Sequence, residues 1–331
     1  MYPYNKVMRL SDFDYDLPKG LIAQTPAHPR DHARLLVYDR SSRQIVNDFF
    51  YNLSDYLSAG TTLAINNSKV EKARLRFGAV EIFVLEKLGP RTIRALVRPG
   101  KKFQEGKRLE LAELSAETMA VDEEGVRTLE LSKPIDDPSL DRFRQTPFPP
   151  YIKSDKSLDE QYQTVYAEPL GSVAAPTAGL HFTAKQLAML AKTHPIAELT
   201  LHVGLGTFAP VKSVNIDKHK MHAERFSISA EAAKMLNRAS HITAVGTTGV
   251  RVLESVVRPF KPLEDSTDIF IKPGYQFKNT GALITNFHLP KSTLLMLVAA
   301  MVGTDELHHI YSHAIKEKYR FYSFGDAMLI L

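Results

Sequence analysis

The chain of 331 residues contains no cysteine. This absence excludes disulfide bonds, thiolate metal sites and a cysteine nucleophile. A long hydrophobic run is also missing, since the longest, Leu294–Val302, is too short to span a bilayer as a helix. The N-terminal segment MYPYNKVMRL has no apolar signal core. We therefore expect a cytoplasmic enzyme or binding protein with no membrane partner.

Positive charge is in modest excess, with a formal net charge of +5, and it is unevenly distributed. Residues 69–108 contain twelve Lys or Arg and four Asp or Glu, whereas residues 109–142 contain three basic and ten acidic residues. A basic block of this density is typical of a surface that binds a polyanion such as nucleic acid. A solvated face that only keeps the domain soluble is the alternative.

Three zones differ in their hydrophobic spacing. The first ends in the apolar strand TTLAIN, at about residue 68. Residues 69–150 contain short alternating runs separated by Gly and Pro, which predict a small antiparallel β-sheet or β-barrel. Residues 151–331 alternate strand-like and helical segments, which predicts an α/β sheet or barrel. We therefore expect one α/β domain, residues 1–68 and 151–331, with residues 69–150 inserted as a second domain.

The α/β zone yields specific elements. We expect strands in AELTLHV, ITAV, TDIFI and ALIT, in a largely parallel sheet with TTLAIN, and helices over residues 184–193, 229–241, 249–257, 291–303 and 305–319. Junctions rich in glycine or in hydroxyl and amide side chains follow five strand-like runs, at residues 66–69, 176–183, 204–208, 246–251 and 286–293. Because ligands bind at the carboxyl ends of parallel strands, these junctions predict a shared pocket. Turn chemistry alone explains one or two such loops.

The junction PTAGLHFT carries one histidine, His181, directly before a predicted helix. Thr183 and Gln186 have capping-box spacing, so Thr183 is the expected N-cap. The nearby helix dipole favours neutral imidazole, the form that a general base requires. A histidine that hydrogen-bonds the loop backbone is the alternative.

Other junctions give weaker signals. A dinucleotide-binding pattern is matched by Gly204, Gly206 and Ala209, but no helix is predicted after them, so we reject a dinucleotide site here. We expect the two glycines instead to let the backbone approach a ligand closely. Arg251 and Glu254 are spaced to meet on one helix face. The histidines at 181, 202, 219, 222 and 288 raise a metal site as an alternative. There is no His-x-His pair and no Asp that closes a strand, so we expect no metal.

The motifs VAAPTAGLHFT, TLHVGLGTF, AVGTT, TNFHLPKSTLLMLV and YRFYSFGDAMLI together closely resemble the S-adenosylmethionine:tRNA ribosyltransferase-isomerase family of queuosine biosynthesis. The resemblance implies a distorted α/β barrel with a small antiparallel β-barrel domain inserted. It also implies that the ribosyl part of S-adenosylmethionine, a co-substrate rather than a cofactor, is transferred and isomerised onto 7-aminomethyl-7-deazaguanine at the tRNA wobble position. Epoxyqueuosine-tRNA forms, and adenine and methionine are released.

This chemistry suggests roles for the junction residues. His181 and His288 are candidates for acid/base work, and Arg251 for pairing with the methionine carboxylate. The candidate substrate-binding residues are Thr177, Gly179, His202, Gly204, Thr207, Thr247, Thr248, Glu254, Asn286, Ser292 and Arg320. Tyr319, Phe321 and Tyr322 are candidates for stacking on an extruded base, with core packing as the alternative.

The basic block would contact tRNA phosphates, and its candidates are Lys69, Arg74, Lys101, Lys102, Lys107 and Arg108. Nothing in the sequence indicates a dimer interface, so we expect a monomer. Two other functions stay open on the residues alone. One is a metal-dependent α/β-barrel hydrolase of a small molecule, and the other is a non-catalytic RNA-binding module.

Overall fold

The computed structural model describes residues 8–153, 155–204, 211 and 215–331. The chain divides into two compact units. Unit 1 comprises Met1–Lys69, Pro150–Lys153 and Glu160–Leu331, and unit 2 comprises Val70–Pro149 and Ser154–Asp159. No helix in the described ranges is long and apolar enough to cross a membrane.

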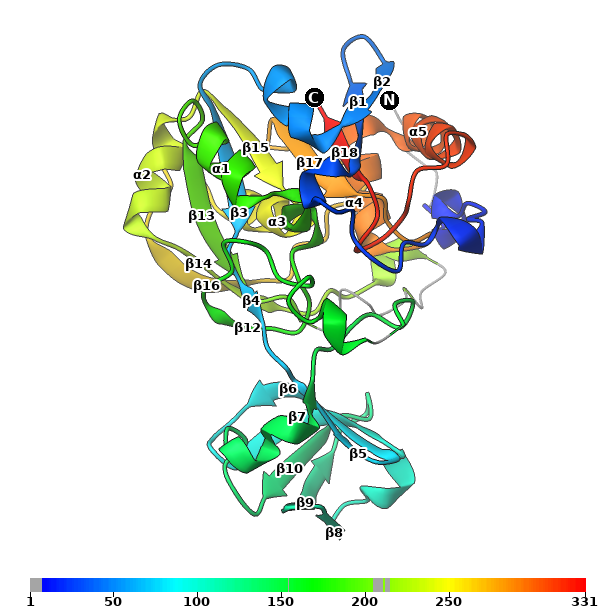
Figure 1. The fold of residues 1–331 in the computed structure, drawn as a ribbon, viewed down its shortest axis with the longest axis vertical. Coiled ribbons are helices and arrows are strands. Elements are labelled where there is room, and N and C mark those ends of the chain that lie inside the picture. The colour runs from blue at the N-terminus through cyan, green and yellow to red at the C-terminus, as the bar shows by residue number, and fades with distance from the viewer. Residues whose placement is uncertain (1–7, 154, 205–210, 212–214) are drawn as a thin grey trace. The chain divides into compact units, whose positions relative to one another are not determined.

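Unit 1 is built on a nine-stranded mixed sheet with the order β16-β14-β13-β3-β15-β17-β18-β1-β2. Its four central strands, β13 (Ile196–Leu201), β3 (Thr61–Asn66), β15 (His241–Val245) and β17 (Ala282–Asn286), run parallel. The outer strands are β16 (Leu263–Thr267), β14 (Glu224–Ile228), β18 (Ala327–Ile330), β1 (Arg34–Asp39) and β2 (Gln44–Phe49). The last strand, β18, therefore lies beside β1, from near the start of the chain (Figure 1).

The predicted α/β class is confirmed, but the predicted barrel is not. Among the described strands, the edge strands β16 and β2 do not pair with each other, so the sheet is open. An α/β barrel closes through strands that all run in one direction. Here β14 runs antiparallel to β13, and β18 runs antiparallel to β17, so the run of parallel strands ends on both sides of the four central strands.

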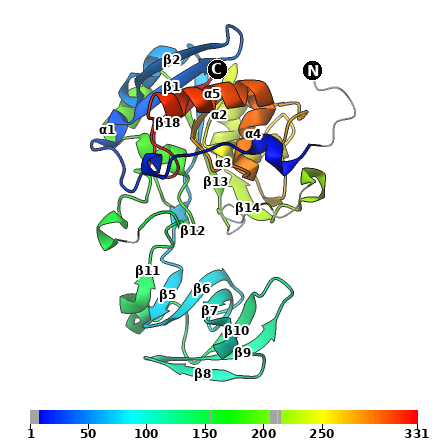
Figure 2. The same cartoon turned by 90° about the vertical axis from the view of Figure 1, so that its right-hand side faces the viewer.

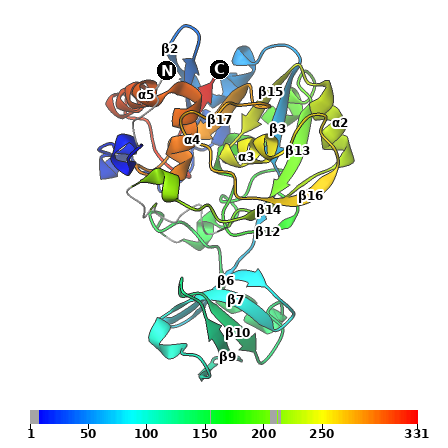
Figure 3. The same ribbon diagram turned by 180° about the vertical axis from the view of Figure 1, so that it is seen from behind.

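Helices cover both faces of this sheet and create two cores. Helices α2 (Ala230–Arg238), α3 (Thr247–Ser255), α4 (Thr293–Val302) and α5 (Thr304–Lys316) pack on one face. Figure 3 shows α3 and α4 together on that face. Helix α1 (Ala184–Leu190) and the 3-10 helix η4 (Phe50–Tyr56) pack on the other. Side chains alternate between the cores, with Leu63 and Ile65 in one and Ala64 in the other, which explains the apolar run of β3.

All five helices predicted from hydrophobic spacing are present, with ends shifted by a few residues. The strand predicted in TDIFI is misplaced. β16 ends at Thr267, which pairs with Glu224, the first residue of β14. The chain after Thr267 therefore has no residue of β14 to pair with. The strand-like SVAA segment also lies outside the main sheet, because the adjoining strand β12 (Leu170–Ser172) pairs with β4 (Lys69–Val70).

Unit 2 is a seven-stranded antiparallel sheet with the order β11-β5-β6-β7-β10-β9-β8, and it curls into a half-barrel (Figure 2). Its strands are β5 (Arg74–Phe77), β6 (Val80–Lys87), β7 (Thr92–Arg98), β8 (Arg108–Leu111), β9 (Leu114–Val121), β10 (Arg127–Leu131) and β11 (Arg144–Gln145). The remaining 3-10 helices among the described residues are η1 (Leu10–Phe13), η2 (Lys19–Leu21), η3 (Arg30–His32), η5 (Gly100–Lys102), η6 (Pro138–Phe143), η7 (Lys156–Leu158), η8 (Thr177–His181) and η10 (Ile216–Lys218).

Candidate active site

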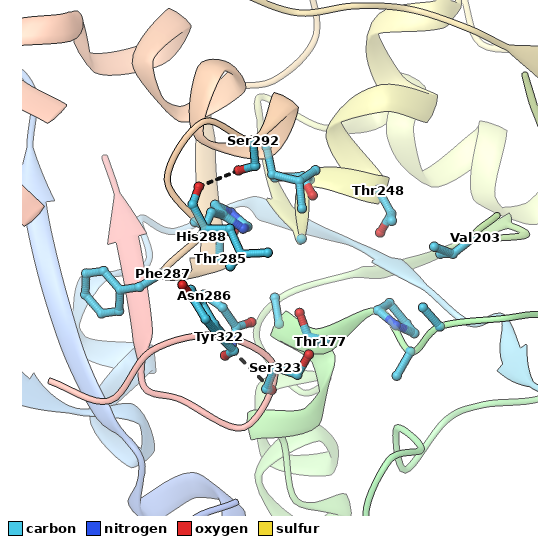
Figure 4. A pocket seen from close by; sticks show the side chains of 18 of the residues that line it. Thr177, Val203, Thr248, Thr285, Asn286, Phe287, His288, Ser292, Tyr322 and Ser323 are labelled. Atoms are coloured by element: carbon cyan, nitrogen blue, oxygen red, sulfur yellow. Dashed lines mark hydrogen bonds between the residues drawn. The ribbon is translucent and has the colours of Figure 1, made fainter. Parts of the chain in front are cut away.

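A pocket opens in unit 1, beyond the carboxyl ends of β15 and β17. Its walls come from residues 174–178 around the start of η8, 246–248 at the start of α3, 285–289 after β17, and 322–323 near the C-terminus. Seven candidate residues predicted from the sequence line it: Thr177, Thr247, Thr248, Asn286, His288, Ser292 and Tyr322. Figure 4 shows His288, Thr285 and Asn286 on one wall, with Thr248 and Val203 across from them.

Two helices begin at this pocket and bring their first residues to its wall. Ser292 caps α4, because its hydroxyl accepts a hydrogen bond of 3.2 Å from the N–H of Leu295. Helix α3 begins at Gly246 with φ of 85° and has no side-chain cap. This positive φ is a conformation that glycine adopts without strain. In the described residues, the buried Oγ1 of Thr248 has no hydrogen-bond partner.

His288 is held from three directions. Its Nε2 lies 2.7 Å from Oγ1 of Thr285, and its backbone N–H donates to the hydroxyl of Tyr311 over 3.0 Å. The hydroxyl of Tyr15 donates to the His288 carbonyl. Burial lowers the pKa of His288 to about 3, so its imidazole is neutral at physiological pH. The site therefore presents a fixed, uncharged ring to the pocket.

Asn286 separates His181 from the pocket. The Asn286 amide nitrogen donates to the carbonyl of Tyr322 over 3.0 Å and lies 3.3 Å from Nε2 of His181. Its Oδ1 is buried without a partner in the described ranges. His181 does not line the pocket; its ring lies 5.2 Å from that of Phe50, and burial lowers its pKa to about 4. His181 thus contacts the site through Asn286.

The helix after His181 begins where the sequence predicted. Thr183 caps α1 by accepting from the N–H of Gln186 over 3.1 Å, which confirms the predicted N-cap. The Gln186 side chain donates to the carbonyl of Phe50 instead of returning to the cap. Gly179, a candidate substrate-binding residue, does not line the pocket, and a Cβ there would overlap the hydroxyl of Tyr166.

Arg251 and Glu254 form separate networks, so the predicted pair between them is wrong. Arg251 forms a buried ion pair with Glu224, whose Oε1 accepts from the N–H of Gly204 over 2.7 Å. Burial lowers the pKa of Arg251 to about 10. Glu254 instead accepts three backbone N–H groups, those of residues 278–280. Arg251, Gly204 and Glu254 are absent from the pocket wall.

Of three other predicted residues, two lie away from the pocket and one lies outside the described residues. His202 lies in a second hollow with Arg225 and Glu264, and burial lowers its pKa. Arg320 is held by Asp326, which accepts from its Nη2 over 3.0 Å and from its backbone N–H over 2.8 Å. Thr207 lies outside the described residues.

The aromatic candidates divide between core and pocket. Tyr319 and Phe321 are fully buried in the core of unit 1, so stacking on a base is excluded for them in this conformation. Tyr322 lines the pocket. The sequence analysis missed Tyr151, Thr285 and Ser323, which also line it. Tyr151 follows a proline-rich segment, and its hydroxyl lies 2.8 Å from Oγ of Ser323, so only tertiary contact identifies it.

Except for Lys69, the basic block lies in a unit without net charge, since unit 2 contains sixteen basic and sixteen acidic residues. Arg74 pairs with Glu81, and Arg108 pairs with Glu110 over 3.0 Å. The other candidates, Lys69 in unit 1 and Lys101, Lys102 and Lys107 in unit 2, are exposed, and no ion pair to them is found in the described ranges.

Within the described parts of the chain, no group of three or more His, Asp or Glu side chains is arranged to hold a metal ion. The pocket instead combines hydroxyl groups, one amide and a neutral imidazole. Such a set can hydrogen-bond a sugar or a base edge and can stabilise developing charge on a ligand.

Comparison with known proteins gives matches over nearly the whole chain. The chain is 48% identical to an S-adenosylmethionine:tRNA ribosyltransferase-isomerase of Thermotoga petrophila and 49% identical to one of Thermosipho africanus, in each case over 98% of this chain and 100% of the relative. The crystal structure of an S-adenosylmethionine tRNA ribosyltransferase from Thermotoga maritima matches 97% of this chain and 100% of that chain, with a TM-score of 0.56 and 38% identity. Residues 10–330 match the family model of queuosine biosynthesis proteins. The chain therefore belongs to the queuosine biosynthesis protein family.

Proposed function

We propose that the chain transfers and isomerises the ribosyl part of S-adenosylmethionine onto the 7-aminomethyl group of 7-aminomethyl-7-deazaguanine at the tRNA wobble position. The products are epoxyqueuosine-tRNA, adenine and methionine. The observation that carries this proposal is the full-length similarity to relatives named S-adenosylmethionine:tRNA ribosyltransferase-isomerase. The metal-dependent hydrolase and the inert RNA-binding module are not favoured.

The pocket of unit 1 suits this reaction chemically. Thr177 and Thr248 line the pocket and would hydrogen-bond ribose or base edges, and Asn286 has an amide oxygen without a partner in the described ranges. His288 is neutral and fixed, as acid/base work or hydrogen bonding to a leaving purine requires. Arg251 would reach the methionine carboxylate only by leaving Glu224.

tRNA would bind through phosphate contacts, and the target base would be extruded into the pocket. Lys69, Lys101, Lys102 and Lys107 are the basic candidates that remain available for phosphates. Tyr322 is the aromatic candidate for stacking. The monomeric state and the cytoplasmic location stay predictions.

The direct test is incubation of the protein with S-adenosylmethionine and tRNA that carries the deazaguanine precursor. We expect nucleoside mass analysis to detect the ribosyl-derived adduct and chromatography to detect one adenine per adduct. If neither product forms, the proposed function is wrong. Full activity after treatment with a chelator is also expected, whereas loss of activity that zinc restores would favour a metal-dependent enzyme.

A further inference from the structure

The buried hydroxyl of Thr285 has one available acceptor. Thr285 is 1% exposed, and its Oγ1 lies 2.7 Å from Nε2 of His288. In the described ranges this hydroxyl has no other hydrogen-bond partner. If Nε2 carried the proton, the hydroxyl hydrogen of Thr285 would be buried without an acceptor, at a cost of about 1–3 kcal/mol. The hydroxyl of Thr285 therefore donates to Nε2.

This direction fixes the tautomer of His288. A neutral imidazole carries one proton, so a ring that accepts at Nε2 carries its hydrogen at Nδ1. No partner for Nδ1 is found among the described residues, and the ring lines the pocket. Tyr15 and Tyr311 hold the backbone of His288, and the contact of Nε2 with Thr285 sets which ring nitrogen faces this threonine.

We propose that Thr285 is a positioning residue that holds His288 in the tautomer with Nδ1–H directed into the pocket, as a hydrogen-bond donor to a ring nitrogen of the adenine of S-adenosylmethionine. This inference rests on the proposed function, and it gives His288 the role of donor to the leaving purine rather than that of base. Negative charge accumulates on the purine as its bond to ribose breaks, and a fixed donor stabilises that charge.

The neighbouring wall supplies the complementary group. The orientation of the Asn286 amide is set by its nitrogen, which donates to the Tyr322 carbonyl. Its Oδ1 is therefore the acceptor left without a partner in the described part of the chain. Adenine presents an amino donor beside ring-nitrogen acceptors, so one donor and one acceptor on this wall match that class of ligand.

The tautomer is tested without substrate by long-range ¹H–¹⁵N correlation spectra of the labelled protein, with His288 assigned from a His288→Gln variant. We expect the His288 ring to be protonated at Nδ1 in the wild type and in Thr285→Ser, and to lose that fixed state in Thr285→Val. A wild-type ring protonated at Nε2 would overturn the inference. Thr118→Val in unit 2, another buried threonine, is the matched control and should leave the His288 signals unchanged.

The link to adenine is tested by single-turnover kinetics with S-adenosylmethionine and with its 1-deaza, 3-deaza and 7-deaza analogues. Thr285→Val should slow the reaction of S-adenosylmethionine at least about tenfold, and Thr285→Ser should restore it. With the analogue that lacks the accepting nitrogen, wild type and Thr285→Val should react at similar rates. An equal ratio of the two rates for all four compounds would refute the contact with adenine. Failure of the wild type to react at all would refute the proposed function, while the spectra would still test the tautomer.

Discussion

Arginine–glutamate pairs occur in both units, but they lie in opposite environments. Arg251 and Glu224 of unit 1 have side chains that are 7% and 4% exposed, whereas Arg108 and Glu110 of unit 2 are 59% and 75% exposed. The buried pair connects α3, β14 and the N–H of Gly204. The exposed pair lies on β8 and faces water. The same two residue types therefore organise the interior of one unit and partly neutralise the surface of the other.

The units also differ in where their unpaired polar groups lie. In unit 1, Asn286 Oδ1 and Thr248 Oγ1 are buried without hydrogen-bond partners in the described ranges, and both residues line the pocket. The buried Oγ1 of Thr118 in unit 2 also has no partner there, but Thr118 does not line the pocket. In unit 2, several cations of the basic block pair with nearby acids, such as Arg91 with Glu130. We conclude that the density of charge in a sequence does not measure the charge available to a ligand.

The largest effect is expected from breaking the buried pair. Arg251→Met leaves Glu224 buried without its partner and should lower the free energy of unfolding by about 3–5 kcal/mol. Arg108→Met, the exposed counterpart, should change it by less than about 1 kcal/mol. Denaturant unfolding measures both. Equal effects of the two substitutions would contradict the contrast between the units.

The next effect concerns the pocket. His288→Gln should lower kcat about 10²–10³-fold, the usual loss when one fixed donor to developing charge is removed, while the protein stays folded. Adenine release measures the rate, and circular dichroism measures the fold. The control is His241→Gln, at the exposed start of β15. Near-normal turnover by His288→Gln would remove this residue from the mechanism.

Between about pH 4 and 6.5, the range in which histidines titrate, the pH dependence of stability should be a property of unit 1, which contains every histidine of the chain. Burial lowers the pKa of His181 to about 4 and that of His288 to about 3, from an ordinary value of 6.5. The unfolded chain therefore binds protons at these histidines first as the pH falls, so their contribution to stability is constant above about pH 6.5 and decreases below it. Each histidine should contribute up to about 1.4 kcal/mol per pH unit down to about pH 4. Unfolding measured at several pH values should give a smaller slope for His288→Gln, and an unchanged slope would refute this account.

The smallest effect is expected at the surface of unit 2. Charge reversal of Lys101, Lys102 and Lys107 should weaken tRNA binding and reduce the slope of log affinity against log salt by up to about 3, because each phosphate contact contributes about one. Charge reversal of Arg108, which is paired with Glu110, should lower the affinity for tRNA less than charge reversal of Lys107 does. Filter binding at several salt concentrations measures this. Unchanged affinity in the triple variant would exclude this surface from docking.

Short-range sequence signals predicted the elements that build the pocket. Hydrophobic period located α3 and α4, capping chemistry located the start of α1, and the polar junctions after β15 and β17 pointed to Thr248, Asn286 and His288. These signals are local, since they depend on residues within a few positions of one another.

The rest of the site depends on long-range contacts. Arg251 was predicted to meet Glu254, three residues away, but it meets Glu224, which reaches it from β14. Gly179 accommodates Tyr166, and Tyr151 lies beside Ser323, which is 172 positions away in the sequence. Strand order decides these neighbours, and no periodicity within one segment encodes it.

The central claim is that the pocket beside His288 holds the adenosyl group. The most direct measurement is a crystal structure of the protein with S-adenosylhomocysteine, which lacks the reactive sulfonium. We predict the adenine within hydrogen-bond distance of Nδ1 of His288, on the wall formed by residues 285–289. Adenine bound elsewhere, for example in the hollow beside His202, with the pocket of unit 1 empty, would contradict the account.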